Sequence, residues 1–305
     1  MIQIAQILCP IDFSEFSRRA LDHAVAMAGW YGARLTVLHV ISKPPLIDRP
    51  PITLREGDRE RITADMKRVI AYVPSDVSLD LRLEEASDIH REILSQADAI
   101  HADLIVIGSH GRSGFERLLL GSVTEKVLRK APCPTMVVPR RAPDTAADEP
   151  VRFRRILCPV DFSHGSTSAL SYALHVAEGA QAQLTLLHAV DIVPELRETP
   201  SSESVGTDRA RAAAEADCLQ RLNQSVPEEA RTYCTVKSVV RQGPAHSEIL
   251  KLARERGIDL IVMGVQGRGA LERLIFGSNT ARVTRAATCP VLIVRPDSDR
   301  GTHSA

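Results

Sequence analysis

The sequence predicts an α/β protein in which one fold is written twice. Its 305 residues correspond to two domains of the usual size of about 150 residues each. Residues 7–14 recur as residues 156–163, and residues 35–40 recur as residues 184–189 at the same offset. Within each half, apolar runs alternate with helical patterns, and this alternation is typical of a parallel sheet covered by helices.

Composition narrows the class of protein. The 38 basic and 38 acidic side chains cancel, so net charge does not favour nucleic acid or a membrane as partner. No run approaches the roughly 20 apolar residues of a membrane span, and the N-terminus has no basic, apolar leader. We therefore expect a soluble, cytoplasmic protein. Four cysteines that match between the halves are expected to be inert core residues: Cys9, Cys158, Cys133 and Cys289.

In the first half, each element follows from its local pattern. Gln6 begins the first apolar strand, and Ser14 is placed to cap a helix that continues to about Gly29. The second strand leads into a proline-rich loop at 43–52, and a charged helix follows it. The predicted strands are 6–11, 34–41, 77–83, 104–107 and 134–138, and the predicted helices are 14–29, 57–72, 87–99 and 123–130.

The second half repeats this order with a net insertion before its glycine-rich loop. An irregular loop is expected at 191–206, a helix at 208–223 and a last strand at 290–294. Residues 142–152 are polar and rich in proline, which is typical of a surface linker. The predicted organisation is therefore a domain at 1–141, a linker at 142–152, a domain at 153–296 and a disordered tail at 297–305.

A glycine-bearing loop follows the fourth strand in each half. The spacing Gly-x2-Gly-x9-Gly-Ser occurs at 108–122 and again at 264–278. Glycines let a ligand approach the main chain, and the free N–H groups of the following helix favour an anion. The loops therefore predict two phosphate sites. No Gly-x4-Gly-Lys-Ser/Thr sequence occurs, so a P-loop ATPase is excluded.

This spacing resembles the ATP-binding signature of the universal stress protein family, and two copies resemble its tandem members. The resemblance implies two open five-stranded parallel sheets of order 3-2-1-4-5, the adenine-nucleotide alpha-hydrolase-like fold. It also implies ATP as ligand, with AMP or ADP as alternatives. The implied ligand-binding residues are Asp12, Val40, Gly108, Gly111, Arg112, Gly121, Ser122 and Val123, and in the second half Asp161, Ala189, Gly264, Gly267, Arg268, Gly277, Ser278 and Asn279.

Asp12 and Asp161 each follow the first strand of their half. Ligands of open parallel sheets bind beyond the carboxyl ends of the strands, where strand order reverses. We therefore expect strands one and four to be neighbours, with the aspartates beside the glycine loops. In the resembled family the matching aspartate contacts adenine, with help from the backbone at Val40 or Ala189. The alternative is a carboxylate that only stabilises a turn or a helix N-terminus.

Other motifs have competing interpretations. Ser122-Val-Thr-Glu125 could form a capping box, whereas Ser278-Asn-Thr-Ala281 lacks the glutamate, so phosphate binding better explains both serines. The loop arginines, Arg112, Arg117, Arg268 and Arg273, could neutralise phosphate or be surface residues. His39 and His188 are expected to be satisfied core histidines. His110 is matched by Gln266, which argues against a shared acid-base or metal role, and no zinc site is expected.

Unequal sites are also predicted. Ser87 is expected to occupy the place that Gly243 has in the second half, so the loop after strand three could approach a ligand differently in the two domains.

The resemblance thus implies a nucleotide-dependent stress regulator that binds ATP, and we expect Mg²⁺ to accompany the ATP because adjacent phosphates need neutralisation. The alternative is a slow ATPase or an adenylate-transferring enzyme with the same sites, which would need a group to position water. The apolar fifth strands and the resemblance predict that the two halves pair within the chain. A homodimer would then use another surface.

Overall fold

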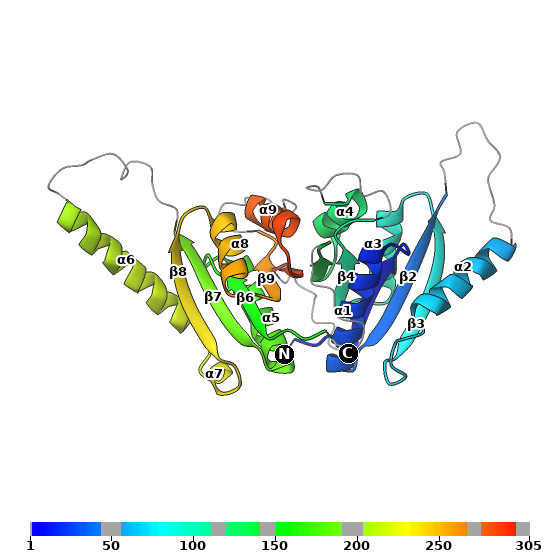
Figure 1. Ribbon diagram of the computed structural model, residues 1–305, viewed down its shortest axis with the longest axis horizontal. Coiled ribbons are helices and arrows are strands. Elements are labelled where there is room, and N and C mark those ends of the chain that lie inside the picture. Colours follow the sequence, from blue (N-terminus) through cyan, green and yellow to red (C-terminus); the bar gives the residue numbers. More distant parts are fainter. Residues whose placement is uncertain are drawn as a thin grey trace, which may run out of the picture. The chain divides into compact units, whose positions relative to one another are not determined.

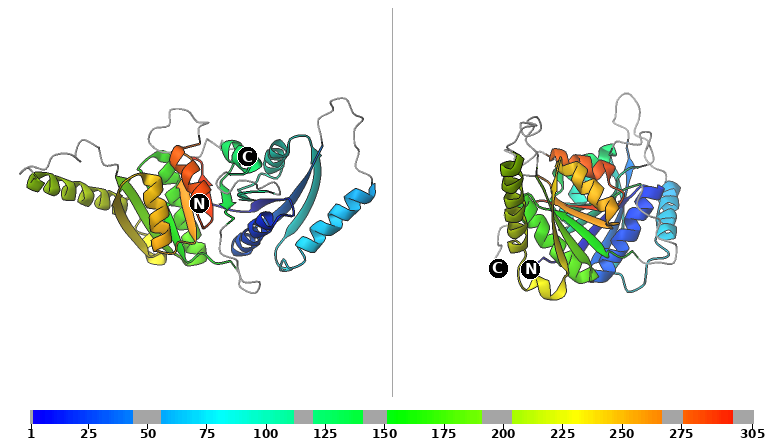
Figure 2. Two further views of the ribbon diagram at one scale, coloured as in Figure 1. Left: turned by 45° about the horizontal axis from the view of Figure 1, so that its top comes forward. Right: turned by 60° about the vertical axis from the view of Figure 1, so that its left-hand side comes forward.

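The structure is a computed structural model that describes residues 2–43, 56–111, 120–140, 151–190, 204–266 and 276–296, with the backbone alone at 56 and 204–211. The chain forms two compact units, Met1–Arg152 and Phe153–Ala305. In each unit, helices lie on both faces of a sheet (Figures 1 and 2). Residues 142–150 of the predicted linker at 142–152 and the predicted tail at 297–305 lie outside the described residues, so those boundaries stay predictions.

The first unit contains a parallel sheet of order β3-β2-β1-β4-β5. This is the predicted order 3-2-1-4-5. Strand order reverses at β1, whose neighbours are β2 on one side and β4 on the other. The strands are β1 (Gln6–Ile11), β2 (Arg34–Ser42), β3 (Leu79–Ala86), β4 (Leu104–Gly108) and β5 (Thr135–Val138).

The helices of the first unit cover the two faces of this sheet. They are α1 (Glu15–Tyr31), α2 (Glu56–Val69), α3 (Ile89–Ala99) and α4 (Ser122–Lys130). Helix α1 packs on β1 and β4, whereas α3 packs on β2 and against α4. Right-handed crossovers require this division, because the chain moves outward in opposite directions on the two sides of β1.

The second unit repeats the topology with the sheet order β8-β7-β6-β9-β10. Its strands are β6 (Arg155–Pro159), β7 (Gln183–Val190), β8 (Val236–Gln242), β9 (Leu260–Gly264) and β10 (Val291–Val294). Its helices are α5 (His164–Ala180), α6 (Ser204–Gln224), α7 (Ala230–Tyr233), α8 (Ala245–Glu255) and α9 (Ser278–Ala286). The four-residue α7 was not predicted, because so short a segment carries no helical period.

Several predicted boundaries were wrong by a few residues. Helix α1 continues past Gly29 to Tyr31, because Gly32 at φ 60° provides the left-handed C-terminal cap. Strand β3 begins two residues later than predicted and ends three later, in register with β2 from Leu35↔Leu79 to Ser42↔Ala86. The predicted loops at 43–52 and 191–206 fall mostly outside the described residues, although α6 already begins at Ser204.

Core cysteines are confirmed as buried, free thiols. Cys9, Cys133, Cys158 and Cys289 are all buried. Burial raises the pKa of the Cys9 and Cys158 thiols well above the usual range, and it raises that of Cys289 to about 12. A thiol that stays protonated is a poor nucleophile. Among the helices that the structure describes, none combines the length and the apolar character needed to cross a membrane.

Candidate functional site

Strands β1 and β4 are neighbours, as predicted, and their loops meet at the carboxyl edge of the sheet. The register pairs Ile7 with Leu104. Asp12 follows β1 and Gly111 follows β4, and a Cβ added to Gly111 would lie 2.7 Å from Asp12 Oδ2. Since that distance is shorter than any ordinary contact, Gly111 has to be a glycine for the aspartate to keep this position.

The two aspartates form the same hydrogen-bond network. Asp12 Oδ1 accepts bonds from Ser14 N at 3.0 Å and from Ser14 Oγ at 2.5 Å. Asp161 Oδ1 accepts from Ser163 N and Oγ at the same two distances. Ser14 and Ser163 are in turn the N-caps of α1 and α5. The carboxylates therefore stabilise helix N-termini, and their contact with a ligand stays a prediction.

A strained residue follows each aspartate. Phe13 has φ 63° and Phe162 has φ 61°, a left-handed conformation that bulky side chains rarely adopt. Their rings pack on His39 and His188, with centroids 4.5 and 4.7 Å apart. Strain repeated in both halves indicates a constrained position, of the kind that clusters at functional sites.

His39 and His188 are satisfied histidines, as expected. Nδ1 of His39 lies 2.8 Å from the carbonyl oxygen of Ile11, and Nδ1 of His188 lies 2.7 Å from that of Val160. Because a carbonyl only accepts, each Nδ1 carries the proton. These bonds join the end of the second strand to the end of the first in each half.

The first glycine of each motif has a packing role. A Cβ on Gly108 would lie 3.0 Å from the carbonyl oxygen of Phe16, and one on Gly264 would lie 2.7 Å from the carbonyl of Gly165. Phe16 and Gly165 stand in the first turns of α1 and α5. The glycines thus allow the helix backbone to approach the strand end, in addition to any approach by a ligand.

Two threonines that the sequence analysis did not single out position the helix after the loop. Thr124 Oγ1 donates to the carbonyl of Gly108 at 2.8 Å, and Thr280 Oγ1 donates to that of Gly264 at 2.9 Å. Both threonines are buried. The repeated Ser-x-Thr at 122–124 and 278–280 was the available signal. The hydroxyls fix the N-termini of α4 and α9 over the ends of β4 and β9.

The capping-box interpretation of Ser122 is wrong. The N-cap of α4 is Gly121, and Ser122 is the first helical residue; Gly277 and Ser278 have the same positions at α9. A capping box needs the hydroxyl at the N-cap. Ser122 and Ser278 are exposed, and the structure gives neither hydroxyl a partner among the described residues. Each serine lies beside helical N–H groups that favour an anion.

The remaining predicted site residues lie in strands, in the helices after the loops, or outside the described residues. Val40 and Ala189 lie inside β2 and β7, in register with Glu84 and Arg241. Val123 is half-buried, and Asn279 is exposed. The loop residues Arg112, Gly267 and Arg268 lie outside the described residues, as do Arg117 and Arg273.

The loops after β3 and β8 differ, as expected, but not by a simple exchange of Ser87 for Gly243. Gly243 has φ 138°, which favours glycine. When the two halves are aligned at the starts of α3 and α8, Gly243 matches Ser87. When they are aligned by the register of β3 and β8 with their neighbouring strands, Gly243 matches Ala86. The first half therefore has one extra residue between the strand and the helix. Beside it, Glu85 pairs with Lys43 at 2.8 Å and Arg59 at 2.5 Å. The hydrogen bond from Lys43, aided by Arg59, lowers the pKa of Glu85.

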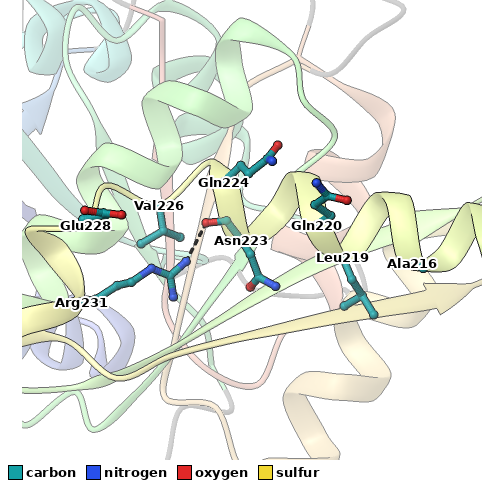
Figure 3. A pocket seen from close by; sticks show the side chains of 8 residues that line it. All are labelled: Ala216, Leu219, Gln220, Asn223, Gln224, Val226, Glu228 and Arg231. Atoms are coloured by element: carbon teal, nitrogen blue, oxygen red, sulfur yellow. Dashed lines mark hydrogen bonds between the residues drawn. The ribbon is translucent and has the colours of Figure 1, made fainter.

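A surface pocket in the second unit lies away from this site (Figure 3). It is lined by α6, α7 and the turn between them, and Arg231 donates to the carbonyl of Asn223 at 2.6 Å. Helix α7 leads into the start of β8, so the pocket belongs to the amino edge of the sheet. In the described part of the chain, no cluster of three or more histidine, cysteine or acidic residues could hold a metal ion.

Comparison with known proteins gives one consistent family. The model of the universal stress protein family matches residues 4–139 and 152–295. A universal stress protein of Mycolicibacterium smegmatis is 29% identical over 300 residues, covering 95% of this chain and 97% of that protein. Universal stress protein YxiE of Bacillus subtilis is 34% identical over 148 residues, covering 47% of this chain and 99% of its own.

A solved structure shows the same fold over nearly the whole chain. The crystal structure of a universal stress protein from Archaeoglobus fulgidus has a TM-score of 0.65 at 22% identity, and the match covers 96% of this chain and 97% of that one.

Proposed function

The chain belongs to the universal stress protein family, and from that membership we propose that it is a nucleotide-dependent stress regulator whose two halves each bind ATP. The observation that carries the proposal is the convergence of three features at one sheet edge. These are a carboxylate after the first strand, a glycine loop after the fourth strand, and a helix that begins with an exposed serine. Both units have all three.

The proposed roles follow from the chemistry of each group. Asp12 and Asp161, with the backbone of Val40 and Ala189, would contact the adenine. Helix N-termini and backbone N–H groups suit phosphate oxygens, and Mg²⁺ would neutralise adjacent phosphates. The residues proposed near the phosphates are Gly108, Gly111, Arg112, Gly121, Ser122 and Val123, and their counterparts Gly264, Gly267, Arg268, Gly277, Ser278 and Asn279.

Regulation is favoured over hydrolysis. Turnover needs a group that positions the attacking water. The described loop residues, 108–111 and 120–121 in the first half and 264–266 and 276–277 in the second, include no carboxylate. The loop glutamates, Glu116 and Glu272, lie outside the described residues. Pairing of the halves through their fifth strands stays a prediction from the family resemblance.

Serine variants give the sharpest test. Because Ser122 and Ser278 are exposed and are given no hydrogen bond by the described residues, changing them to alanine should leave the fold intact. We expect the double variant Ser122→Ala, Ser278→Ala to bind Mg-ATP about tenfold more weakly, by calorimetry, if each hydroxyl donates to a charged phosphate. Ser75→Ala, an exposed serine before β3 at the opposite sheet edge, is the matched control and should bind like the wild type.

Absence of nucleotide binding by the wild-type chain would contradict the proposal. If the wild-type chain binds no adenine nucleotide with or without Mg²⁺, neither half is a nucleotide site.

A further inference from the structure

One pair of side chains distinguishes the first glycine loop from the second. Ser109-His110 occupies the place of Val265-Gln266. Ser109 is 3% exposed, and its Oγ lies 2.9 Å from Nδ1 of His110. The second half can make no such bond, because valine has no polar group in its side chain.

The direction of this hydrogen bond follows from counting donors. If Nδ1 donated to Ser109 Oγ, the buried serine proton would need another acceptor, and the structure shows none among the described residues. If Ser109 donates to Nδ1, the serine is satisfied. The neutral ring then carries its proton on Nε2. Ser109 therefore makes Nε2 a hydrogen-bond donor.

That donor has no partner among the residues that the structure describes. Nε2 of His110 is buried. A buried donor without an acceptor destabilises the folded protein, so such a group calls for an explanation. A ligand that brings an acceptor oxygen would supply the missing bond.

The backbone of His110 lies between two parts of the candidate site. The position of a Cβ on Gly121, the N-cap of α4, is 3.4 Å from the Cα of His110, and Gly111 lies against Asp12. The His110 ring also meets the Phe16 ring edge-on, with centroids 6.1 Å apart.

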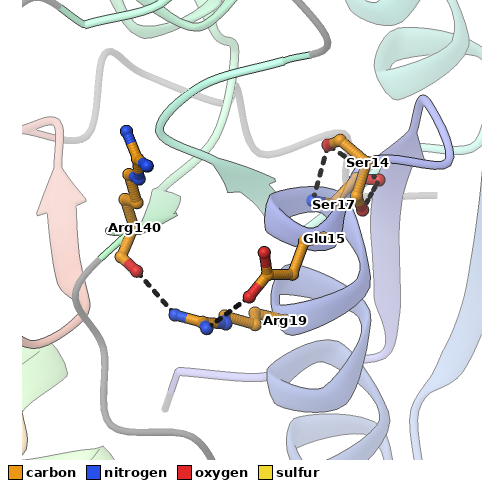
Figure 4. A network of polar contacts seen from close by, with 5 residues as sticks. All are labelled: Ser14, Glu15, Ser17, Arg19 and Arg140. Atoms are coloured by element: carbon orange, nitrogen blue, oxygen red, sulfur yellow. Dashed lines mark hydrogen bonds and ion pairs between the residues drawn. The ribbon is translucent and has the colours of Figure 1, made fainter. Parts of the chain in front are cut away.

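Phe16 is itself held in place. The Arg140 guanidinium lies 5.5 Å from the centroid of its ring. Arg19 donates to the Arg140 carbonyl at 2.5 Å and pairs with Glu15 at 2.6 Å (Figure 4). The imidazole is thus fixed by packing as well as by Ser109.

We propose that His110 is a specificity-determining residue of the first site, whose Nε2–H donates to a phosphate oxygen of the bound nucleotide. The inference rests on the proposed nucleotide function. The acceptor is assigned to phosphate because the neighbouring N-terminus of α4 favours negative charge. Ser109 is the positioning residue that fixes the donor form of the ring. In the second site Gln266 also carries a donor in its side-chain amide, but Val265 has no hydroxyl that could orient it, so we expect the first site to discriminate more strongly between nucleotides by their phosphates.

Ring-nitrogen NMR tests the contact directly. In the full chain labelled with ¹⁵N-histidine, the His110 signals are identified by their loss in His110→Gln. We expect the protonated ring nitrogen to be Nε2 in the free protein and to shift on adding AMP or ATP but not adenosine. In Ser109→Ala, we expect the His110 ring to become a mixture of the forms protonated on Nδ1 and on Nε2. A ring protonated on Nδ1, or one whose signals do not move with ATP, overturns the inference.

Affinity provides the second measurement. His110→Phe keeps an aromatic ring beside Phe16 but removes the donor. We expect about tenfold weaker ATP binding at one of the two sites, the size expected for a lost hydrogen bond to a charged group, with adenosine binding unchanged. His110→Gln places at this position the residue that the second half has. It serves as the control for whether the chain still folds when the imidazole is replaced. Wild-type ATP affinity at both sites in His110→Phe would overturn this inference alone, whereas a wild-type chain that binds no nucleotide would overturn the proposed function as well.

Discussion

The two halves of the chain share one set of contacts and differ in another. The aspartate–serine network has the same distances in both, and the buried threonine bonds are 2.8 and 2.9 Å. Around the loop itself the halves diverge, since Phe16 is replaced by Gly165 and Ser109-His110 by Val265-Gln266. The shared contacts build the sheet edge, and we propose that the divergent ones adjust what that edge binds.

The largest expected effect is a loss of stability when alanine replaces the first glycine of each motif. Its size should differ between the halves, because the helix backbone approaches Gly264 more closely than Gly108. Gly264→Ala would place a Cβ 2.7 Å from the Gly165 backbone, whereas Gly108→Ala would place one 3.0 Å from Phe16. We expect Gly264→Ala to destabilise its half by about 3 kcal/mol and Gly108→Ala by less, since overpacking costs roughly 1–3 kcal/mol. Denaturant unfolding, with hydrogen exchange to assign each half, measures both.

The control for this pair is Gly29→Ala. Gly29 lies within α1 with nothing near its missing Cβ, so alanine there should stabilise the first half by about 0.5–1 kcal/mol. Equal losses from Gly108→Ala and Gly264→Ala would contradict the different packing described for the two halves.

A smaller effect should be the same in both halves. Thr124→Ala and Thr280→Ala each remove a buried hydroxyl that bonds to a strand-end carbonyl. We expect each to cost about 1 kcal/mol, the net value of a typical hydrogen bond. Thr→Ser at the same positions keeps the hydroxyl and should recover most of the loss. A substantial loss in only one half would show that the two helix N-termini are not held alike.

A weaker effect should occur in the first half alone. Arg19 bonds to the Arg140 carbonyl and to Glu15, and Ser168 occupies the matching place in the second half. Because surface pairs contribute about 0–1 kcal/mol, we expect Arg19→Ala to cost roughly 0.5 kcal/mol. Hydrogen exchange should increase in α1 and leave α5 unchanged, and equal protection of α1 in the variant and the wild type would contradict the contact.

The smallest expected effect is a pH dependence from His23, which Tyr172 replaces in the second half. Burial lowers the pKa of His23, although its bond to the Arg19 carbonyl opposes the shift. As the pH falls, His23 therefore takes up a proton in the unfolded chain before it does so in the folded chain. The contribution of neutral His23 to stability is present above about pH 6.5 and is lost as the pH falls through the pKa of His23 in the folded chain.

His23→Gln should flatten that pH slope in the first half. Burial also lowers the pKa of His175 in the second half, so the slope there should persist in the variant. Unfolding followed between pH 7 and pH 5 compares the two, and an unchanged slope in the first half would assign the effect to other groups.

Much of the fold was predictable because its causes are local and repeated. Apolar runs and the cap at Ser14 give the elements of the first unit, and the duplicated sequence gives those of the second. The limits of β3 were not predictable, since its ends depend on pairing with β2.

Of the candidate site, the sequence located the loops and the aspartates but not the contacts between them. The approach of Gly111 to Asp12, and of Gly264 to Gly165, exists only once distant segments are folded together. The N-cap at Gly121 and the bonds of Thr124 and Thr280 depend likewise on where a helix begins relative to a strand end.

The most direct test of the central claim is the nucleotide content of freshly purified, denatured protein, measured by chromatography against protein concentration. We expect ATP in amounts matching one molecule for each half of the chain. Predominantly ADP would favour hydrolysis at the same sites. No nucleotide, together with no binding of added Mg-ATP, would contradict the claim that the two glycine loops are nucleotide sites.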